Sequence, residues 1–286
     1  MTRPDKRLNA YRTDLADIRL KGTVEASRFI EATPMRVSTL FADLYSAPDD
    51  TGGIDTQLLH GDSVSVFDTQ GDWAWVQSDM DGYVGYLPIS TLTTPGDEPT
   101  HMVLAPRTFL YTESDLKSAR AGFRSMGSQV KVVDEATTRG TDYLILKDGS
   151  SVIARHLIAI GDWMSDLVSV AETLLHTPYL WGGNTAFGVD CSGLISLANR
   201  LCGKMVLRDS DMQAESIGEV LETDRQFSNL QRGDLVFWKG HVGMMFDAET
   251  LLHSNGHTMD VALEPFAGAV ERIGYLYGQP TLVRRP

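Results

Sequence analysis

The chain has 286 residues, with 25 lysine and arginine residues against 38 aspartate and glutamate residues and a formal net charge of −13. Nucleic acids and anionic membrane surfaces would repel such a chain, so neither is expected as a partner. The length exceeds that of one typical domain and predicts two or three folded units.

The N-terminal stretch, Met1–Ala10, carries charges and is not followed by an apolar run of signal-peptide length. We therefore expect neither a secretory signal nor a membrane anchor, and a cytoplasmic location. Residues 1–32 are predicted to form a separate segment with a short helix. Two cysteines, Cys191 and Cys202, lie about 16 Å apart on one predicted helix, so both thiols are expected to be free.

An internal duplication fills the next stretch of the chain. Five residues recur at an offset of 66, namely Leu44, Tyr45, Gly61, Val64 and Val66, followed by Leu110, Tyr111, Gly127, Val130 and Val132. Short alternating strands between Gly and Asp turns surround these residues, which predicts a small all-β barrel in each copy. Turn-forming residues between Thr93 and Pro99 place the first barrel at residues 33–95 and the second at residues 96–162.

The third predicted unit, residues 163–286, contains a helix that begins at Cys191. Asp190 is a good N-cap, apolar residues follow with helical spacing, and Gly203 ends the pattern. A cysteine at a helix N-terminus has its pKa lowered by the unpaired N–H groups there, as a nucleophile requires. The alternative is that Cys191 is an ordinary buried cysteine of the core.

Residues 234–254 alternate apolar strands with turns at residues 239–240 and 247–250, which predicts an antiparallel meander. His241 and His253 fall on neighbouring strands of this meander. Side chains alternate between the faces of a sheet, so the two imidazoles meet only if the second turn has an odd effective length or carries a bulge.

A thiol nucleophile needs an imidazole base, and that base needs a polar partner on its other nitrogen. Cys191, His241 and His253 supply such a set. His257 is the rival third residue, and its alternative role is that of a solvated loop histidine.

Four blocks of the third unit closely resemble the NlpC family of papain-like bacterial peptidases, which cut peptidoglycan stem peptides. The blocks are Thr177–Asn184, Asp190–Gly193, Arg232–Phe246 and Leu251–Ser254. The resemblance runs from about Asp162 to the C-terminus and implies an α+β fold in which a helix packs on an antiparallel sheet.

A second resemblance lies in the first barrel. Residues 81–88 are similar to the bacterial Src-homology-3-like module that often precedes NlpC domains. The second copy has residues 147–152 in place of that signature. We therefore expect the second barrel to serve packing, not ligand binding.

The family resemblance implies the catalytic roles. Cys191 would be the nucleophile, His241 the base that takes its proton, and His253 the residue that orients His241. Tyr179 matches the family tyrosine that supplies an oxyanion donor beside the Cys191 backbone N–H. The alternative for Tyr179 is an aromatic residue that only fills the core.

Further residues are expected to bind substrate: Asp190, Ser192, Tyr83, Tyr86, Arg208, Asp209 and Ser210. Asp190 is the carboxylate nearest to the nucleophile, so we expect it to pair with a free α-amine of the substrate, with Tyr83 or Tyr86 as the wall. Helix capping is the alternative role of Asp190, and a carboxylate with two oxygens can serve both.

The chain is similar to cytoplasmic gamma-D-glutamyl-L-diamino acid peptidases of peptidoglycan recycling. This resemblance implies hydrolysis of the γ-D-glutamyl to diamino acid bond in peptidoglycan-derived stem peptides with a free N-terminal L-alanine. No cofactor or metal is expected. The alternatives are a wall endopeptidase that acts on glycan-linked stems, a catalytically silent wall-binding protein, and a transferase that passes the acyl group to an amine or lipid. The diamino acid and the oligomeric state stay open.

Overall fold

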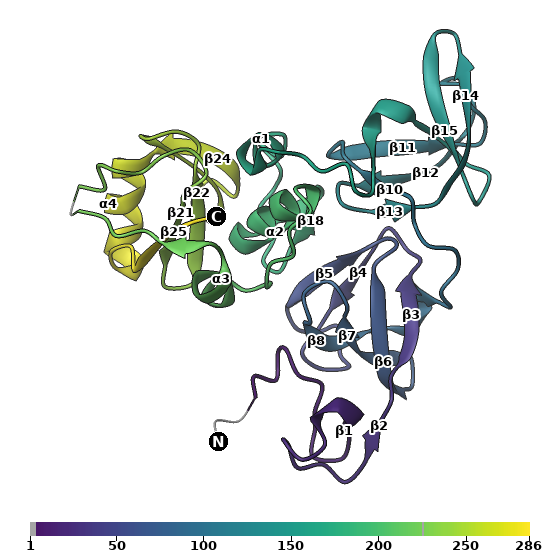
Figure 1. Cartoon of the computed structure of the whole chain (residues 1–286), viewed down its shortest axis with the longest axis horizontal. Coiled ribbons are helices and arrows are strands. Elements are labelled where there is room, and N and C mark those ends of the chain that lie inside the picture. Colours follow the sequence, from purple (N-terminus) through teal and green to yellow (C-terminus); the bar gives the residue numbers. More distant parts are fainter. Residues whose placement is uncertain (1–3, 225) are drawn as a thin grey trace. The chain divides into compact units, whose positions relative to one another are not determined.

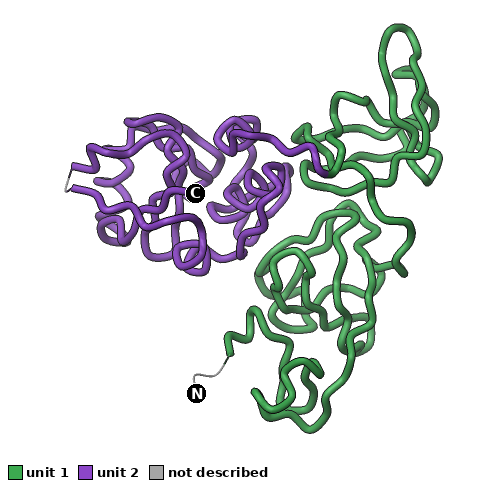
Figure 2. Tube along the Cα trace, in the orientation of Figure 1, with its two compact units in different colours: residues 1–160 green, residues 161–286 purple. Residues whose placement is uncertain are grey.

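The computed structural model describes residues 4–224 and 226–286. The chain divides into two compact units, residues 1–160 and residues 161–286, which Figure 2 draws in different colours. In the described residues, no helix is both long and apolar enough to cross a bilayer.

Unit 1 begins with a short segment that packs on the strands after it. The segment contains β1 (Ala16–Asp17), the 3-10 helix η1 (Ile18–Leu20) and β2 (Phe29–Ile30), and β1 pairs with β2 in parallel. Ala10 and Leu15 join a buried cluster with Phe67 and Trp75. The Arg12 guanidinium lies 4.5 Å from the centre of the Trp75 ring, so a cation–π contact adds to this packing.

The rest of unit 1 is made of short strands in two modules. The first module contains β3 (Thr33–Val37), β4 (Phe41–Leu44), β5 (Thr56–Leu59), β6 (Ser63–Gln70), β7 (Trp73–Ser78), β8 (Val84–Pro88), η2 (Ile89–Thr91) and β9 (Leu92–Thr93). Its sheets have the orders β8-β7-β6-β3-β9 and β4-β5, and all neighbours are antiparallel.

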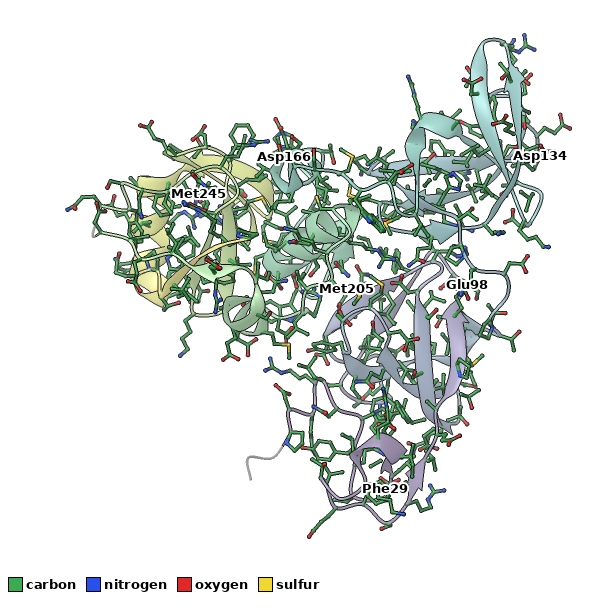
Figure 3. All side chains as sticks on the ribbon, in the orientation of Figure 1. Phe29, Glu98, Asp134, Asp166, Met205 and Met245 are labelled. Atoms are coloured by element: carbon green, nitrogen blue, oxygen red, sulfur yellow. The ribbon has the colours of Figure 1, made fainter. Side chains whose placement is uncertain are left out.

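The second module repeats this order of elements. It contains β10 (His101–Val103), β11 (Arg107–Tyr111), β12 (Arg120–Ser125), β13 (Gln129–Val130), β14 (Val132–Thr138), β15 (Thr141–Leu146), β16 (Ser151–Ile153), η3 (Ala154–His156) and β17 (Leu157–Ala159). Its sheets are β12-β11-β16-β15-β14 and β13-β10-β17. Acidic side chains such as Asp134 on β14 are exposed on its surface (Figure 3).

The residues that revealed the duplication have matching structural roles. Leu44 and Leu110 are both buried on strands of their own modules. Gly61 and Gly127 adopt φ values of 88° and 81°, a left-handed conformation that favours glycine. A Cβ atom on Gly61 would also lie 2.5 Å from the backbone oxygen of Gln129, so this position cannot hold a side chain without movement of the second module.

In the described part of unit 2, four helices accompany a six-stranded antiparallel sheet (Figure 1). The helices are α1 (Leu167–Glu172), α2 (Cys191–Leu201), α3 (Ser210–Ser216) and α4 (Phe266–Tyr277). The main sheet has the order β20-β25-β21-β22-β23-β24, with β20 (Glu219–Val220), β21 (Leu235–Trp238), β22 (His241–Met245), β23 (Thr250–Asn255), β24 (Asp260–Pro265) and β25 (Leu282–Arg285). A short hairpin, β18 (Asn184–Thr185) and β19 (Gly188–Val189), leads into α2. The expected α+β class is confirmed.

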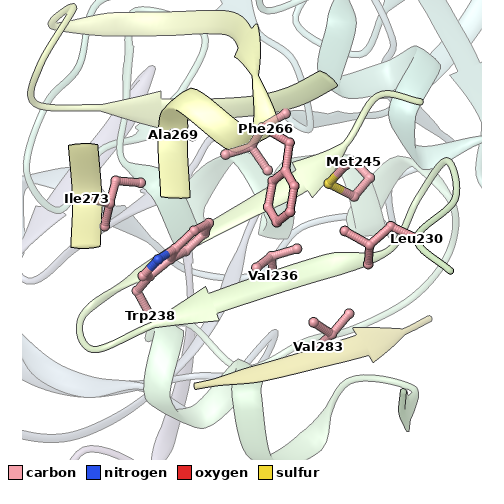
Figure 4. Close-up of a cluster of buried hydrophobic side chains, with 9 residues drawn as sticks. Leu230, Val236, Trp238, Met245, Phe266, Ala269, Ile273 and Val283 are labelled. Carbon is pink, nitrogen blue, oxygen red and sulfur yellow. The ribbon is translucent and has the colours of Figure 1, made fainter. Parts of the chain in front are cut away.

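The core of unit 2 lies between α4 and the sheet. Figure 4 shows Phe266, Ala269 and Ile273 of α4 above Val236, Trp238 and other apolar side chains of the strands. Burial of these side chains contributes roughly 1.5 to 3 kcal/mol for each large residue. This packing holds the strands that carry His241 and His253 in fixed positions.

Candidate active site

Cys191 is the first residue of α2 and is 8% exposed. The helix begins there because the Asp190 side chain accepts a hydrogen bond of 2.7 Å from the backbone N–H of Gly193. Behind the cysteine, Leu194, Ile195 and other apolar side chains of the helix are fully buried. The helix ends before Gly203, whose φ of 72° suits a helix C-terminus. The thiol is therefore held at a well-anchored helix N-terminus.

His241 and His253 meet through their ring nitrogens. His241 begins β22, and its Nε2 atom lies 2.9 Å from Nδ1 of His253 on β23. The register explains the contact, because Met245 pairs with Leu251 and leaves residues 246–250, an odd number, as the connection. The condition on the turn is thus met, and His241 and His253 fall on one face of the sheet.

His257 lies elsewhere in this region. It is exposed in the turn after β23, where its backbone N–H donates to the Asn255 side chain at 2.9 Å. His253, not His257, is thus the histidine that contacts His241. Since Nε2 of His241 is used in this contact, Nδ1 is the nitrogen left to face the thiol.

The Cys191 thiol is close to the start of β22. It interacts with the backbone N–H of Val242, the residue after His241. Burial raises the pKa of the thiol to about 12, with a further contribution from Asp190, and these effects outweigh the Val242 N–H and Arg208. The lowered pKa expected from the helix N-terminus is therefore wrong for the substrate-free site, because desolvation is the larger effect.

Burial also acts on the base. It lowers the pKa of His241 to about 3, and the neighbouring His253 and Arg272 lower it further while Glu264 opposes them. Both shifts favour the neutral thiol and the neutral imidazole over the ion pair. Formation of the thiolate therefore requires a base with a free lone pair to remove the proton from sulfur.

Tyr179 lies next to the loop that precedes the nucleophile. Its backbone forms a parallel bridge with Val189, two residues before Cys191, and its N–H donates to the oxygen of Met259. Burial raises the pKa of the Tyr179 hydroxyl, and the nearby Cys191 and Asp190 raise it further. The hydroxyl thus keeps its proton and can donate a hydrogen bond.

A pocket of about 560 Å³ opens beside these residues. Tyr179 and His241 line it together with the aromatic side chains of Trp181 and Tyr277. Lys239 and Arg272 also line it, along with Gly240, Asn255, Gly256, His257, Ile273 and Leu276. Cationic and aromatic side chains thus line a pocket beside His241, as is common for ligand sites.

Over residues 176–271, the sequence matches the NlpC/P60 family, and over residues 44–92 it matches the bacterial dipeptidyl-peptidase Sh3 domain. These two matches cover the thiol–histidine site and the first strand module. The chain contains an NlpC/P60 domain. The match and the relatives described next support a cysteine peptidase, and Cys191, His241 and His253 are the candidate catalytic residues of this NlpC/P60 domain.

Two curated relatives match over both units. Dipeptidyl-peptidase 6 of Lysinibacillus sphaericus is 26% identical over 77% of this chain and 86% of its own length. The gamma-D-glutamyl-L-lysine dipeptidyl-peptidase of Bacillus cereus is 27% identical over 74% of this chain and 70% of its own length. A crystal structure of an NlpC/P60 family protein from Bacillus cereus aligns with a TM-score of 0.73 at 23% identity, over 88% of this chain and 99% of that one. The papain-like fold is thereby confirmed.

Asp190 of the NlpC/P60 domain is surrounded by donors from its own fold. Arg208 donates to both carboxylate oxygens, at 3.0 and 2.8 Å, and the backbone N–H of Gly182 donates at 3.0 Å. Arg208 is only 1% exposed and also contacts Ser192 Oγ at 2.7 Å. The charge of Asp190 is thus already balanced inside the protein. This arrangement favours the capping role over the expected pairing of Asp190 with a substrate amine.

Close backbone packing explains the glycines around this carboxylate. The oxygen of Gly183 accepts hydrogen bonds from the Asp190 backbone N–H at 3.0 Å and from Arg208 at 3.2 Å. A Cβ atom on Gly193 would lie 2.2 Å from that same oxygen. Glycine is therefore required at position 193 for the loop to approach the start of α2.

The other expected substrate residues are in different situations. Asp209 and Ser210 are half-buried at the start of α3, and Asp209 makes no side-chain hydrogen bond that caps this helix. In unit 1, Tyr83 is buried, and the Tyr86 hydroxyl accepts a hydrogen bond of 3.1 Å from Arg12. A role for either tyrosine as a wall of the substrate site stays a prediction.

The sequence analysis missed Glu264 and Arg272. Glu264 Oε1 on β24 lies 2.7 Å from Nε2 of His253, and Arg272 on α4 forms an ion pair with the same oxygen. An acidic residue in an alternating strand and a basic residue on a helix are ordinary in a sequence. The pairing of β23 with β24 brings Glu264 to His253, and α4, which follows β24, brings Arg272 to Glu264.

Proposed function

We propose that this cysteine peptidase hydrolyses the γ-D-glutamyl to diamino acid bond of peptidoglycan stem peptides that carry a free N-terminal L-alanine. The observation that carries the proposal is the extent of similarity to the Bacillus cereus gamma-D-glutamyl-L-lysine dipeptidyl-peptidase, over 74% of the chain. Unit 2 is less than half of the chain. The similarity therefore includes the strand modules, beyond what a shared catalytic fold alone requires.

The proposed reaction has two steps. His241 Nδ1 takes the proton of the Cys191 thiol as sulfur attacks the γ-carbonyl, and the resulting oxyanion accepts hydrogen bonds from the Cys191 backbone N–H and the Tyr179 hydroxyl. The imidazolium then gives its proton to the departing amine of the diamino acid. Water, deprotonated by His241, hydrolyses the thioester and releases the L-Ala-γ-D-Glu dipeptide and the thiol.

The pocket beside His241 supports a diamino acid on the leaving side. Such a group carries at least one carboxylate, and Lys239 is a cation among the pocket's lining residues, whereas Arg272 is paired with Glu264. The position of Lys239 is notable in a chain with a net charge of −13. Trp181, which is 70% exposed, offers an apolar surface to the aliphatic part of the diamino acid.

We propose a partner for the free α-amine of the substrate other than Asp190, which was the expected one. Asp190 is already paired with Arg208, so a second cation at this carboxylate would compete with a buried ion pair. We propose Asp209, which follows Arg208 in the chain and lies half-buried at the start of α3, as the partner of the amine, while a role for Tyr83 or Tyr86 of unit 1 stays a prediction. Asp190 and Ser192 then hold Arg208 and the start of α2 in place.

Mass spectrometry of the purified protein with L-Ala-γ-D-Glu-L-Lys and with the diaminopimelate form tests the proposal. Release of L-Ala-γ-D-Glu is expected, and Cys191→Ala should abolish it. An N-acetylated tripeptide should be cut at least about tenfold more slowly, since loss of one charge pair in a closed site costs more than about 1.4 kcal/mol. Equal rates on both forms, or efficient cleavage of glycan-linked stems, would instead indicate a wall endopeptidase.

A recycling role would place the enzyme in the cytoplasm with free peptides as substrates, and cell fractionation together with assays on intact sacculi tests this part. No cleavage of any stem peptide would leave a wall-binding protein, and transfer of the acyl group to an added amine would indicate a transferase. The same mass spectra distinguish these outcomes.

A further inference from the structure

A carboxylate and a guanidinium stand behind the two histidines. Glu264 Oε1 is 2.7 Å from His253 Nε2, and Arg272 pairs with that oxygen from the other side. The three groups come from β23, β24 and α4, which are held together by the core of unit 2. The site therefore contains a series of neighbouring groups, in the order Cys191, His241, His253, Glu264 and Arg272.

The second ring nitrogen of His253, Nε2, has few possible hydrogen-bond partners. The side chain is 0% exposed, and its Nδ1 atom is used by His241. Among the described residues, Nε2 has no aligned hydrogen bond, and Glu264 is the group that the structure places at ion-pair distance from it. A buried imidazole N–H without an acceptor is unfavourable by about 1 to 3 kcal/mol, and the Glu264 carboxylate at 2.7 Å is the acceptor within reach.

Glu264 stays ionised at neutral pH. Burial by itself raises the pKa of Glu264, but its contacts with His253 and Arg272 outweigh burial and lower the value to about 2. An ionised carboxylate only accepts hydrogen bonds. The group opposite Glu264 must therefore be an N–H, which places a proton on Nε2 of His253.

We propose that Glu264, held by Arg272, is a positioning residue that fixes which nitrogen of each catalytic histidine carries the proton. With its proton on Nε2, neutral His253 has a lone pair on Nδ1 and accepts from Nε2–H of His241. His241 then has its own lone pair on Nδ1, the nitrogen left for the Cys191 thiol. Without Glu264, the opposite tautomers become accessible, and they leave His241 with an N–H where the base is needed.

The proton step is simple in this arrangement. The sulfur–hydrogen bond of Cys191 breaks, the electron pair stays on sulfur, and the proton forms a bond to Nδ1 of His241. The protons on Nε2 of both histidines stay in place, and Glu264 stays ionised. The carboxylate stabilises the imidazolium by charge and does not become protonated.

The charges around His241 and Cys191 determine in which direction loss of the Glu264 charge shifts the thiolate–imidazolium equilibrium. His253 and Arg272 lower the pKa of His241, whereas Glu264 raises it. Around the thiol, Asp190 raises the pKa of Cys191 and Arg208 lowers it. Loss of the Glu264 charge therefore disfavours the thiolate–imidazolium pair, while the groups around the thiol are unchanged.

The test is the rate of Cys191 alkylation by iodoacetamide as a function of pH, measured on the full chain. This rate reports thiolate formation and does not depend on which peptide the enzyme cuts, so it stands apart from the proposed substrate. Glu264→Gln keeps an acceptor but removes the charge, and should slow alkylation at pH 7 by about tenfold and move the profile to higher pH. Glu264→Leu removes both and should have the larger effect, about 100-fold. Glu271→Gln, an exposed position beside Arg272, removes the same charge and should match the wild type.

A peptide assay and nitrogen-15 spectroscopy complete the experiment. The Glu264 variants should lower kcat while KM changes little, and spectra of the wild type should show both His241 and His253 protonated on Nε2. An alkylation profile of folded Glu264→Gln identical to that of the wild type, or a proton on Nδ1 of His241, would overturn the proposal. If Glu264→Leu does not fold, Glu264→Gln and the wild-type spectra still decide.

Discussion

Arg208 provides the sharpest test of how the nucleophile is held. The Arg208→Met substitution keeps a long side chain but removes a guanidinium that is 1% exposed and donates to both oxygens of Asp190, to Ser192 Oγ and to the oxygen of Gly183. Asp190 is left as a buried carboxylate without its cation, and it keeps as donors the backbone N–H groups of Gly182 and Gly193 and the Ser192 hydroxyl. Breaking a buried ion pair in this way costs about 3 to 5 kcal/mol.

The matched control is Arg232→Met in the same unit. Arg232 pairs with Asp166 at 2.8 Å, but the two side chains are 39% and 41% exposed. Surface pairs of this kind contribute about 0 to 1 kcal/mol, so the same substitution should change stability little. The difference between the two variants isolates the effect of burial.

Hydrogen exchange of peptides that cover α2, followed through a denaturant series, measures the unfolding free energy of unit 2 separately from unit 1. We expect the unfolding free energy of Arg208→Met to fall by about 3 to 5 kcal/mol, and that of the Asp190→Asn, Arg208→Met double variant to fall by less than the two single losses together. A loss below about 1 kcal/mol for Arg208→Met, equal to that of Arg232→Met, would refute the idea that this pair holds the start of α2.

The remaining predictions concern the thiol and the histidines. Cys191→Ala should abolish hydrolysis with the fold retained, whereas Cys202→Ala should keep activity within a few fold of the wild type. A peptide assay measures the activity and circular dichroism checks the fold. Equal losses of activity in the two variants would contradict the choice of nucleophile. His253→Ala should lower kcat more than His257→Ala, because His253 contacts His241 at 2.9 Å. The reverse order of kcat values would show that the register of β22 and β23 is wrong. The pKa of His241 is lowered from 6.5 to about 3, so the unfolded state binds the extra proton between these values and stability should fall as pH decreases through this window. Denaturant unfolding of His241→Gln should show a weaker dependence on pH there, and an unchanged slope would argue against the buried neutral imidazole.

Local patterns determined much of this protein without reference to its structure. Asp190 and Gly203 mark the ends of α2 because capping and left-handed conformations depend on residue type and near neighbours. The strands around His241 and His253 follow from alternation and from the turns between them. The thiol–imidazole chemistry follows from the residue types of Cys191, His241 and His253 alone.

Tertiary structure decided what depends on register, on burial and on contacts between distant residues. Either His253 or His257 was compatible with the sequence, and the end of β23 at Asn255, which leaves His257 exposed in the turn, selected His253. The sign of the shift in the thiol pKa depended on how much water the fold removes around Cys191, which no local pattern encodes.

The partners of the buried charges were also set by the fold. Arg208 neutralises Asp190 from 18 positions along the chain, and Glu264 reaches His253 across two paired strands. Ionised groups in an interior are stable only when the surrounding elements bring donors and acceptors to them from several directions. Such contacts require the complete packing of unit 2, and for this reason the sequence indicated the three candidate catalytic residues but not the groups that contact them.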